Sequence, residues 1–167
     1  MVWDNFQNLL VNLLFGISLI TTILYWFSLA IPEIWLFSKI SVIGSIFTNV
    51  IILGILTTRW IISGYFPLSN LYESLLFLTW CLSTIQIFGE YKTNSKIIGS
   101  LICPICLLLI GFSTLILPIE MQKITPLVPA LQSNWLMLHV SMMMLSYATL
   151  ILGSLFSTLF LLIVYLA

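Results

Sequence analysis

His139, the only histidine in the chain, is the first residue whose type could support chemistry. A neutral imidazole is a good ligand for iron, and ionisable groups at membrane depth are costly and often functional. A lone histidine near a membrane interface is nevertheless more often a hydrogen-bonded amphipathic residue than a ligand. A bis-histidine metal site would need a second imidazole, which this chain does not contain.

Cys103 and Cys106 have the Cys-x-x-Cys spacing of redox and metal-binding motifs, but the sequence contains no second pair. They lie inside a long apolar segment, where a thiol is a poor nucleophile. Pro104, between them, would bend a helix there. We therefore interpret the pair as packing residues, and we assign no chemistry to Cys81.

Other catalytic and binding motifs are missing from the sequence. It has no Gly-rich phosphate loop, no paired-carboxylate site and no plausible Ser/His/Asp set. The formal net charge is zero and the basic residues are scattered, so the sequence shows no basic patch of the kind that binds nucleic acid.

Composition places the chain in a lipid bilayer. Of its 167 residues 61% are hydrophobic and 6% are charged, and the mean hydropathy is +1.20. About a quarter of the residues in an ordinary soluble domain are charged, and so few charges cannot cover a surface facing water. Lipid must cover most of the exterior.

The hydrophobic pattern predicts an all-α polytopic bundle that forms a single integral membrane domain over residues 1–167. About twenty apolar residues cross a bilayer as a helix, which satisfies its own backbone hydrogen bonds. Five segments meet this requirement, at about 9–31, 37–57, 71–88, 97–117 and 136–166.

The charged residues lie between these segments or close to their ends, and they predict an orientation. Lys39, Lys92 and Lys96 lie in or beside the first and third connections, against Arg59 and Lys123 in the second and fourth. The positive-inside tendency places the second and fourth connections on the outer or lumenal side. The two termini should lie on opposite sides.

The second connection carries local folding signals. Asn70 and Glu73 have the spacing of a capping box, in which Asn70 caps the next helix and Glu73 reaches back. Gly64 and Pro67 favour a tight turn, so we expect an ordered loop from Arg59 to Ser69.

Two stretches resemble the CcsA family, the haem-handling subunit of the cytochrome c synthase of plastids and cyanobacteria. The first runs from Arg59 to Trp80 and contains Ser-Gly-Tyr-Phe-Pro-Leu-Ser-Asn-Leu-Tyr-Glu-Ser. The second, Pro129 to Ser141, contains Ala-Leu-Gln-Ser-Asn-Trp-Leu-Met-Leu-His. By this resemblance His139 is an external, lumenal axial ligand of haem iron, and Trp135 lies beside it at the interface.

The resemblance also implies a reaction and partners. Haem, as a transported substrate, would be held on the lumenal side and joined by thioether bonds to apocytochrome c, with a CcsB-type synthase subunit as partner. The membrane would be the chloroplast thylakoid. The frequent use of Asn, Ile and Lys is typical of an AT-rich plastid genome and agrees with this location. A cyanobacterial thylakoid or plasma membrane is the alternative.

The sequence also departs from the family pattern. Members often carry histidine at the position of Tyr65, and the resemblance covers only the N-terminal half of the pattern. The Trp-Gly-x-x-Trp-x-Trp-Asp segment, the second external histidine and the membrane histidine are absent. We therefore expect a truncated chain, inactive alone as a haem lyase.

Two other functions remain open. The chain could be a structural or accessory subunit whose apolar faces seek partners, with no chemistry of its own. A small transporter is a weaker alternative, because the segment interiors hold few polar groups beyond residues such as Ser18, Thr21 and Asn49.

Overall fold

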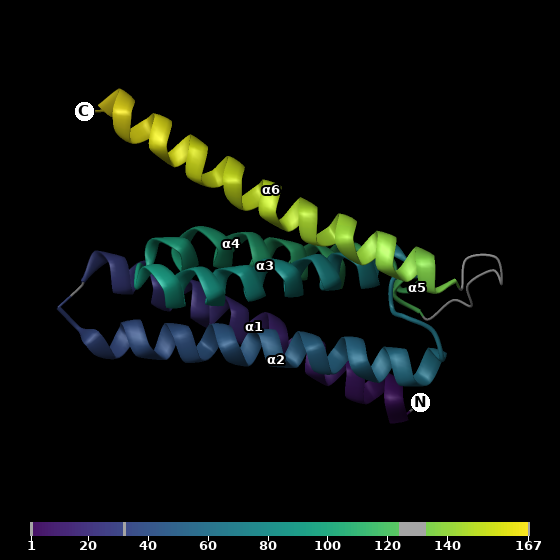
Figure 1. Cartoon of the computed structure of the whole chain (residues 1–167). Coiled ribbons are helices and arrows are strands. Elements are labelled where there is room, and N and C mark those ends of the chain that lie inside the picture. Colours follow the sequence, from purple (N-terminus) through teal and green to yellow (C-terminus); the bar gives the residue numbers. More distant parts are fainter. Residues whose placement is uncertain (1, 32, 124–132, 167) are drawn as a thin grey trace.

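We describe the protein from a computed structural model, which covers residues 2–31, 33–123 and 133–166. These residues contain helices and connections but no strand (Figure 1). The elements in chain order are α1 (Val2–Ala30), α2 (Trp35–Ser63), α3 (Leu71–Thr93), α4 (Ile97–Gly111), the π-helix η1 (Phe112–Ile116), α5 (Ile119–Gln122) and α6 (Asn134–Leu166).

Five helical stretches of the described chain are long and apolar enough to cross a membrane. α4 and η1 together form the fourth stretch. The five are Leu9–Ala30, Trp35–Ser63, Leu71–Thr93, Ile97–Ile116 and Asn134–Leu166. The predicted all-α polytopic bundle is therefore confirmed.

Two helices continue past their predicted ends because the charged residues there are buried. α2 was expected to end at Thr57, yet it continues to Ser63, and Arg59 within it is 3% exposed. α3 was expected to end near Phe88 and continues through the buried Glu90. The expected loop from Arg59 is wrong at its start, since the non-helical connection between α2 and α3 is residues 64–70.

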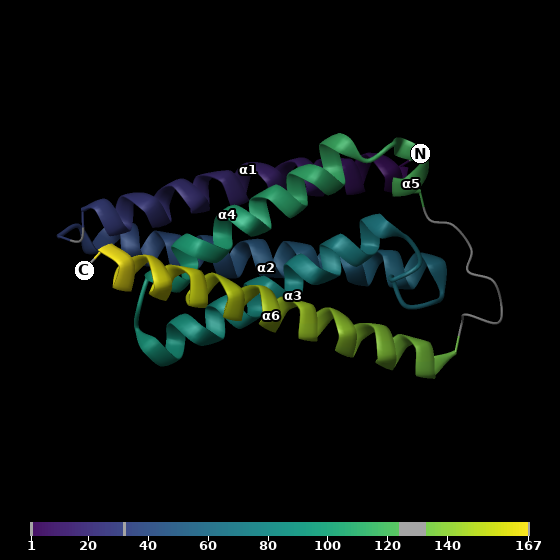
Figure 2. The ribbon, with the colours of Figure 1, turned by 90° about the horizontal axis from the view of Figure 1, so that it is seen from above.

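The first four spanning stretches form the packed part of the bundle. α1 contacts α2 and α4, and α3 contacts α2, α4 and α6. From above, α6 crosses over α3 (Figure 2). The core of the described residues contains the fully buried Leu14, Ile52, Ile55, Leu76, Leu82 and Ile110.

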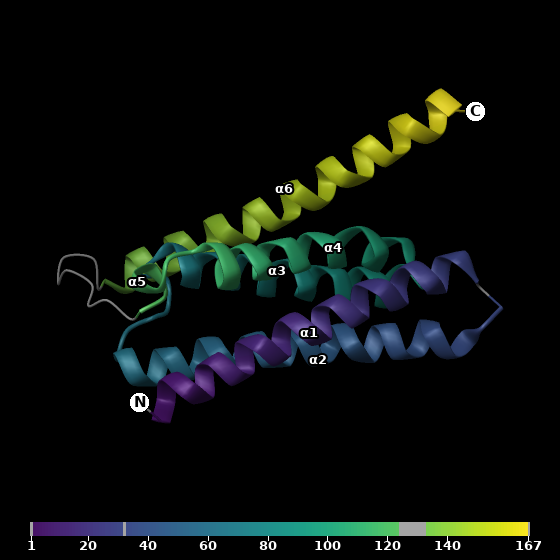
Figure 3. The same ribbon diagram turned by 180° about the vertical axis from the view of Figure 1, so that it is seen from behind.

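α6 is peripheral. It packs with its first half along α3 and then leaves the bundle toward its C-terminal end (Figures 1 and 3). Ala148 is its only fully buried residue within the described chain. The N-terminus and the C-terminus lie at opposite ends of the bundle, as the sequence predicted.

Small polar residues in the bundle interior are satisfied locally. Ser18, Thr21 and Thr48 each donate a hydrogen bond to a carbonyl of their own helix, at 2.9, 2.7 and 2.9 Å. Side chains of this kind allow helices in a membrane to approach closely. We see them as packing residues, not as the lining of an ion path.

Candidate functional site

The candidate site lies at the end of the bundle where α2 ends, α3 and α6 begin, and α5 is located (Figure 1). Gly64 ends α2 with a left-handed φ of 76°, and its N–H donates to the Trp60 carbonyl at 2.9 Å. A residue without Cβ suits this conformation, which reverses the chain toward α3. Asn70 then caps α3 by accepting a hydrogen bond from the Glu73 N–H at 3.0 Å.

A buried ion pair fixes this connection. Arg59 Nε lies 2.9 Å from Glu73 Oε1, and both side chains are almost fully buried. The other carboxylate oxygen of Glu73 accepts hydrogen bonds from the Ser69 N–H and hydroxyl, at 2.9 and 2.7 Å. The predicted Asn70 cap is thus present, but the reciprocal half of the capping box is wrong, because Glu73 accepts from Ser69 and not from the Asn70 N–H.

The same ion pair anchors α5 and α1. The guanidinium of Arg59 donates to the Gln122 carbonyl at 2.8 Å and to Gln7 Oε1 at 3.4 Å. Asn70 Nδ2 donates to the Lys123 carbonyl at 3.0 Å. A carboxylate, a guanidinium and backbone groups therefore hold four segments together at this end.

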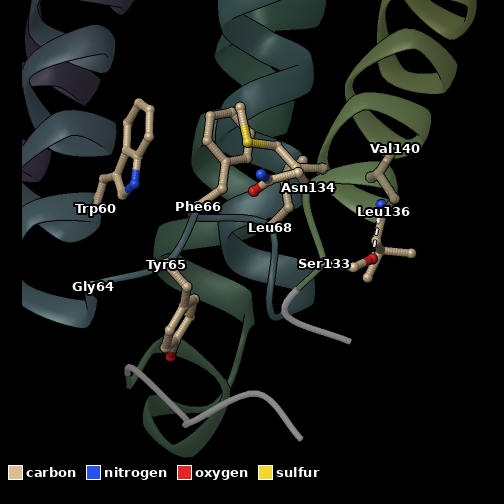
Figure 4. Close-up of a pocket in the computed structure, with 10 residues that line it drawn as sticks. Trp60, Gly64, Tyr65, Phe66, Leu68, Ser133, Asn134, Leu136 and Val140 are labelled. Atoms are coloured by element: carbon tan, nitrogen blue, oxygen red, sulfur yellow. Dashed lines mark hydrogen bonds between the residues drawn. The ribbon is translucent and has the colours of Figure 1, made fainter. Parts of the chain in front are cut away.

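A pocket of about 210 Å³ opens between the α2–α3 connection and the start of α6. Figure 4 shows Trp60 on one side, the α6 side chains on the other, and Phe66 and Leu68 between them. The rings of Trp60 and Phe66 are in edge contact, with centroids 5.1 Å apart. The lining residues are Trp60, Gly64, Tyr65, Phe66, Leu68, Ser133, Asn134, Leu136, Met137 and Val140.

His139 and Trp135 are not part of this pocket. They are four residues apart on α6 and so lie on one face of the helix, with both side chains exposed and Trp135 at 83%. The pocket is lined from another face of α6 by Leu136, Met137 and Val140. The structure therefore brings the two predicted site residues together, but on an open surface.

Two other sequence features have clear positions. Tyr65 lines the pocket, and its ring points away from Trp60 and Phe66 (Figure 4). Cys103 and Cys106 are free thiols buried in α4, where Cys103 donates to Gln86 Oε1 at 3.5 Å. Residues 129–132 of the second family-like stretch lie outside the described residues.

Among the described residues, the start of α6 exposes one imidazole, that of His139, on an open face. Across the described residues no three His, Cys, Asp or Glu side chains converge to hold a metal ion. Sequence reasoning missed the Arg59 ion pair and the aromatic pocket. The available signal was an arginine in an apolar helix, since such a charge needs a partner.

Comparison with known proteins decides the family. Residues 68–166, more than half of the chain, match the family described as Cytochrome C assembly protein. The chain belongs to this family. The matched range begins within the pocket-forming connection and includes His139.

Family relatives confirm the predicted resemblance to CcsA. The cytochrome c biogenesis protein CcsA of Trieres chinensis is 57% identical over 165 residues, which cover 98% of this chain and 53% of that protein. The CcsA proteins of Pyropia yezoensis and Nostoc punctiforme are 54% and 44% identical, each covering 94% of this chain. The chain spans about half the length of these relatives. No solved structure matches it significantly.

Proposed function

We propose that the chain takes part in c-type cytochrome biogenesis at the step of haem attachment, holding haem on the lumenal side for delivery to apocytochrome c. Family membership supports this role, since the relatives are named as cytochrome c biogenesis proteins. The structural observation that carries it is the exposed pair of His139 and Trp135 near the start of α6.

The residues of this face suit one side of a haem. His139 offers an imidazole for the iron, and Trp135 offers a flat apolar ring on the same helix face. The neighbouring pocket is not suited to haem, since its volume of about 210 Å³ lies below the roughly 300–1,000 Å³ of typical ligand sites. Haem would therefore lie against the outside of α6.

A second axial ligand for the iron, and a second surface against the other side of the haem, must come from residues that are not in this sequence. The chain has one histidine, so an imidazole on the other side of the iron requires another polypeptide or the additional length present in the relatives. We propose a CcsB-type synthase subunit and apocytochrome c as partners. The proposed membrane is the chloroplast thylakoid, or its cyanobacterial counterpart.

One observation favours a second candidate function, that of an accessory subunit without chemistry of its own. In the described chain α6 has a single fully buried residue, and its last six described residues, 161–166, are all more than half exposed. Such a helix is suited to packing against another chain in the membrane.

Haem content separates the two functions. The chain is purified in detergent with its co-expressed synthase partner, and bound haem is measured by absorption for wild type, His139→Ala and Leu145→Ala. Leu145 is an exposed control on the same helix. We expect His139→Ala to lose most of the haem and free imidazole to restore it, because imidazole can occupy the vacated ligand position.

Equal haem in wild type and His139→Ala would refute the ligand role. Recovery of the chain with its partner but with no haem in any variant would favour the accessory function.

A further inference from the structure

An open groove follows the seam between α2 and α3, away from the candidate site. Its volume is about 470 Å³, and Phe88 and Tyr91 on its wall are 61% and 84% exposed. In a bilayer these side chains face lipid. The lining residues are Ile46 and Asn49 from α2, and Thr84, Ile87, Phe88 and Tyr91 from α3.

Asn49 places an amide in this groove at the middle of α2, and therefore near mid-membrane depth. Its Nδ2 donates to Ser83 Oγ at 2.7 Å and to Thr84 Oγ1 at 2.9 Å. Both hydroxyls donate their own hydrogens to the Trp80 carbonyl, at 3.0 and 2.8 Å. Contacts with α3 therefore use both amide hydrogens.

The carbonyl end of the amide has no hydrogen-bond partner within the described part of the chain. Asn49 Oδ1 makes no hydrogen bond to any described residue. If the amide were turned over, the two hydroxyls could donate to Oδ1 and the NH₂ group would be left unpaired instead. In either orientation a polar atom is unsatisfied at a depth where lipid chains offer no hydrogen bond, which is unfavourable.

The groove wall has the spacing that a helix partner recognises. Thr84, Ile87, Phe88 and Tyr91 are related as i, i+3, i+4 and i+7, so they form one continuous face of α3. We propose that this groove is the docking site of a transmembrane helix from another polypeptide, which places a hydrogen-bonding side chain against Asn49.

Two other occupants fit the groove less well. An acyl chain of a lipid fills apolar space but supplies no hydrogen bond to the amide. A second copy of this chain in a two-fold contact would present the same patch, in which α3 already uses both amide hydrogens, so two amide oxygens would face each other without a donor. A helix with a central Asn or Ser supplies both a donor and an acceptor.

The test uses synthetic transmembrane peptides of leucine and alanine, with either a central Asn or a central Leu. The full chain is labelled at its N-terminus, and energy transfer to labelled peptide is measured in phosphatidylcholine vesicles. We expect the Asn peptide to bind about 3- to 30-fold more tightly than the Leu peptide, the range expected for one interhelical hydrogen bond in a membrane. Asn49→Leu should abolish this preference.

Substitutions of other residues that line the groove keep the test valid if Asn49→Leu weakens the packing of α2 against α3. Ile46→Trp fills the groove and should weaken binding of the Asn peptide. Phe47→Trp is the matched control, because Phe47 is similarly exposed but points about 100° away. Equal binding of both peptides, a preference that survives Asn49→Leu, or Asn49-dependent self-association in place of peptide binding would overturn the proposal. None of these outcomes depends on haem.

Discussion

Arg59 and Glu73 show how two charged side chains are accommodated in an apolar bundle. Their ion pair is buried and supported by further hydrogen bonds. Glu73 accepts from the Ser69 N–H and hydroxyl, and the Arg59 guanidinium donates to Gln7 Oε1 and to the Gln122 carbonyl. The Asn70 cap of α3 could be predicted because it is local. The ion pair could not, because Arg59 meets Glu73 only after the chain turns at Gly64.

Removing one charge of this pair should destabilise the protein strongly. Glu73→Gln leaves Arg59 buried without a countercharge, and we expect the free energy of unfolding to fall by about 3 kcal/mol. The measurement is reversible unfolding in mixed detergent micelles. Glu120→Gln is the control, because its pair with Lys123 is exposed and should contribute less than about 1 kcal/mol. Equal losses in the two variants would contradict the structural role of the buried pair.

Gly99 should not tolerate a side chain. A Cβ at this position would overlap the Glu90 carboxylate and the ring of Tyr25, which pack closely against α4. We expect Gly99→Ala to lower the unfolding free energy by about 1–3 kcal/mol. Gly54→Ala, in open space within α2, should be neutral or stabilising by up to about 1 kcal/mol, since alanine favours a helix. If Gly99→Ala is as stable as Gly54→Ala, the close contact is wrong.

At the scale of elements, periodicity and length predicted which segments are helices but not which faces meet. The five spans were predicted because each is long and apolar. α2 and α3 run longer than predicted because Arg59 and Glu90 are neutralised or hydrogen-bonded inside the bundle. The sequence placed His139 near the start of a helix, but it could not show that the pocket forms on another face of α6, since that pocket requires residues 64–68 to fold against it.

Because α3 is more deeply packed than α6, shortening a side chain in α3 should destabilise the protein more than shortening one in α6. Leu82 in α3 is fully buried, so Leu82→Ala should lower the unfolding free energy by about 2–5 kcal/mol through lost packing. Leu162 in α6 is 60% exposed, and Leu162→Ala should change it by less than about 0.5 kcal/mol. Unfolding of both variants in the same micelles is the measurement, and comparable losses would mean that α6 packs more tightly than the structure shows.

At the scale of the whole molecule, the basic residues are distributed unequally across the membrane. Lys39, Lys92 and Lys96 at one end oppose Arg59 and Lys123 at the other. Arg59 is 3% exposed and paired with Glu73, so Lys123 is the exposed basic residue that the described chain places at that end. The positive-inside tendency favours an arrangement in which the end bearing the pocket and His139 is lumenal.

Cysteine labelling tests this orientation. The native cysteines are all buried, so a membrane-impermeant maleimide should not reach them in the folded chain. Thr93 is the last residue of α3 and Ser133 directly precedes α6, so Thr93→Cys and Ser133→Cys place exposed thiols at opposite ends of the bundle (Figure 1 shows these two helix ends). In sealed vesicles whose outer surface is the cytoplasmic or stromal side, we expect Thr93→Cys to react directly and Ser133→Cys only after detergent is added. The reverse pattern would place His139 on the side away from the lumen, where it could not present haem to a lumenal apocytochrome. Labelling of both positions from one side would contradict the arrangement of the helices.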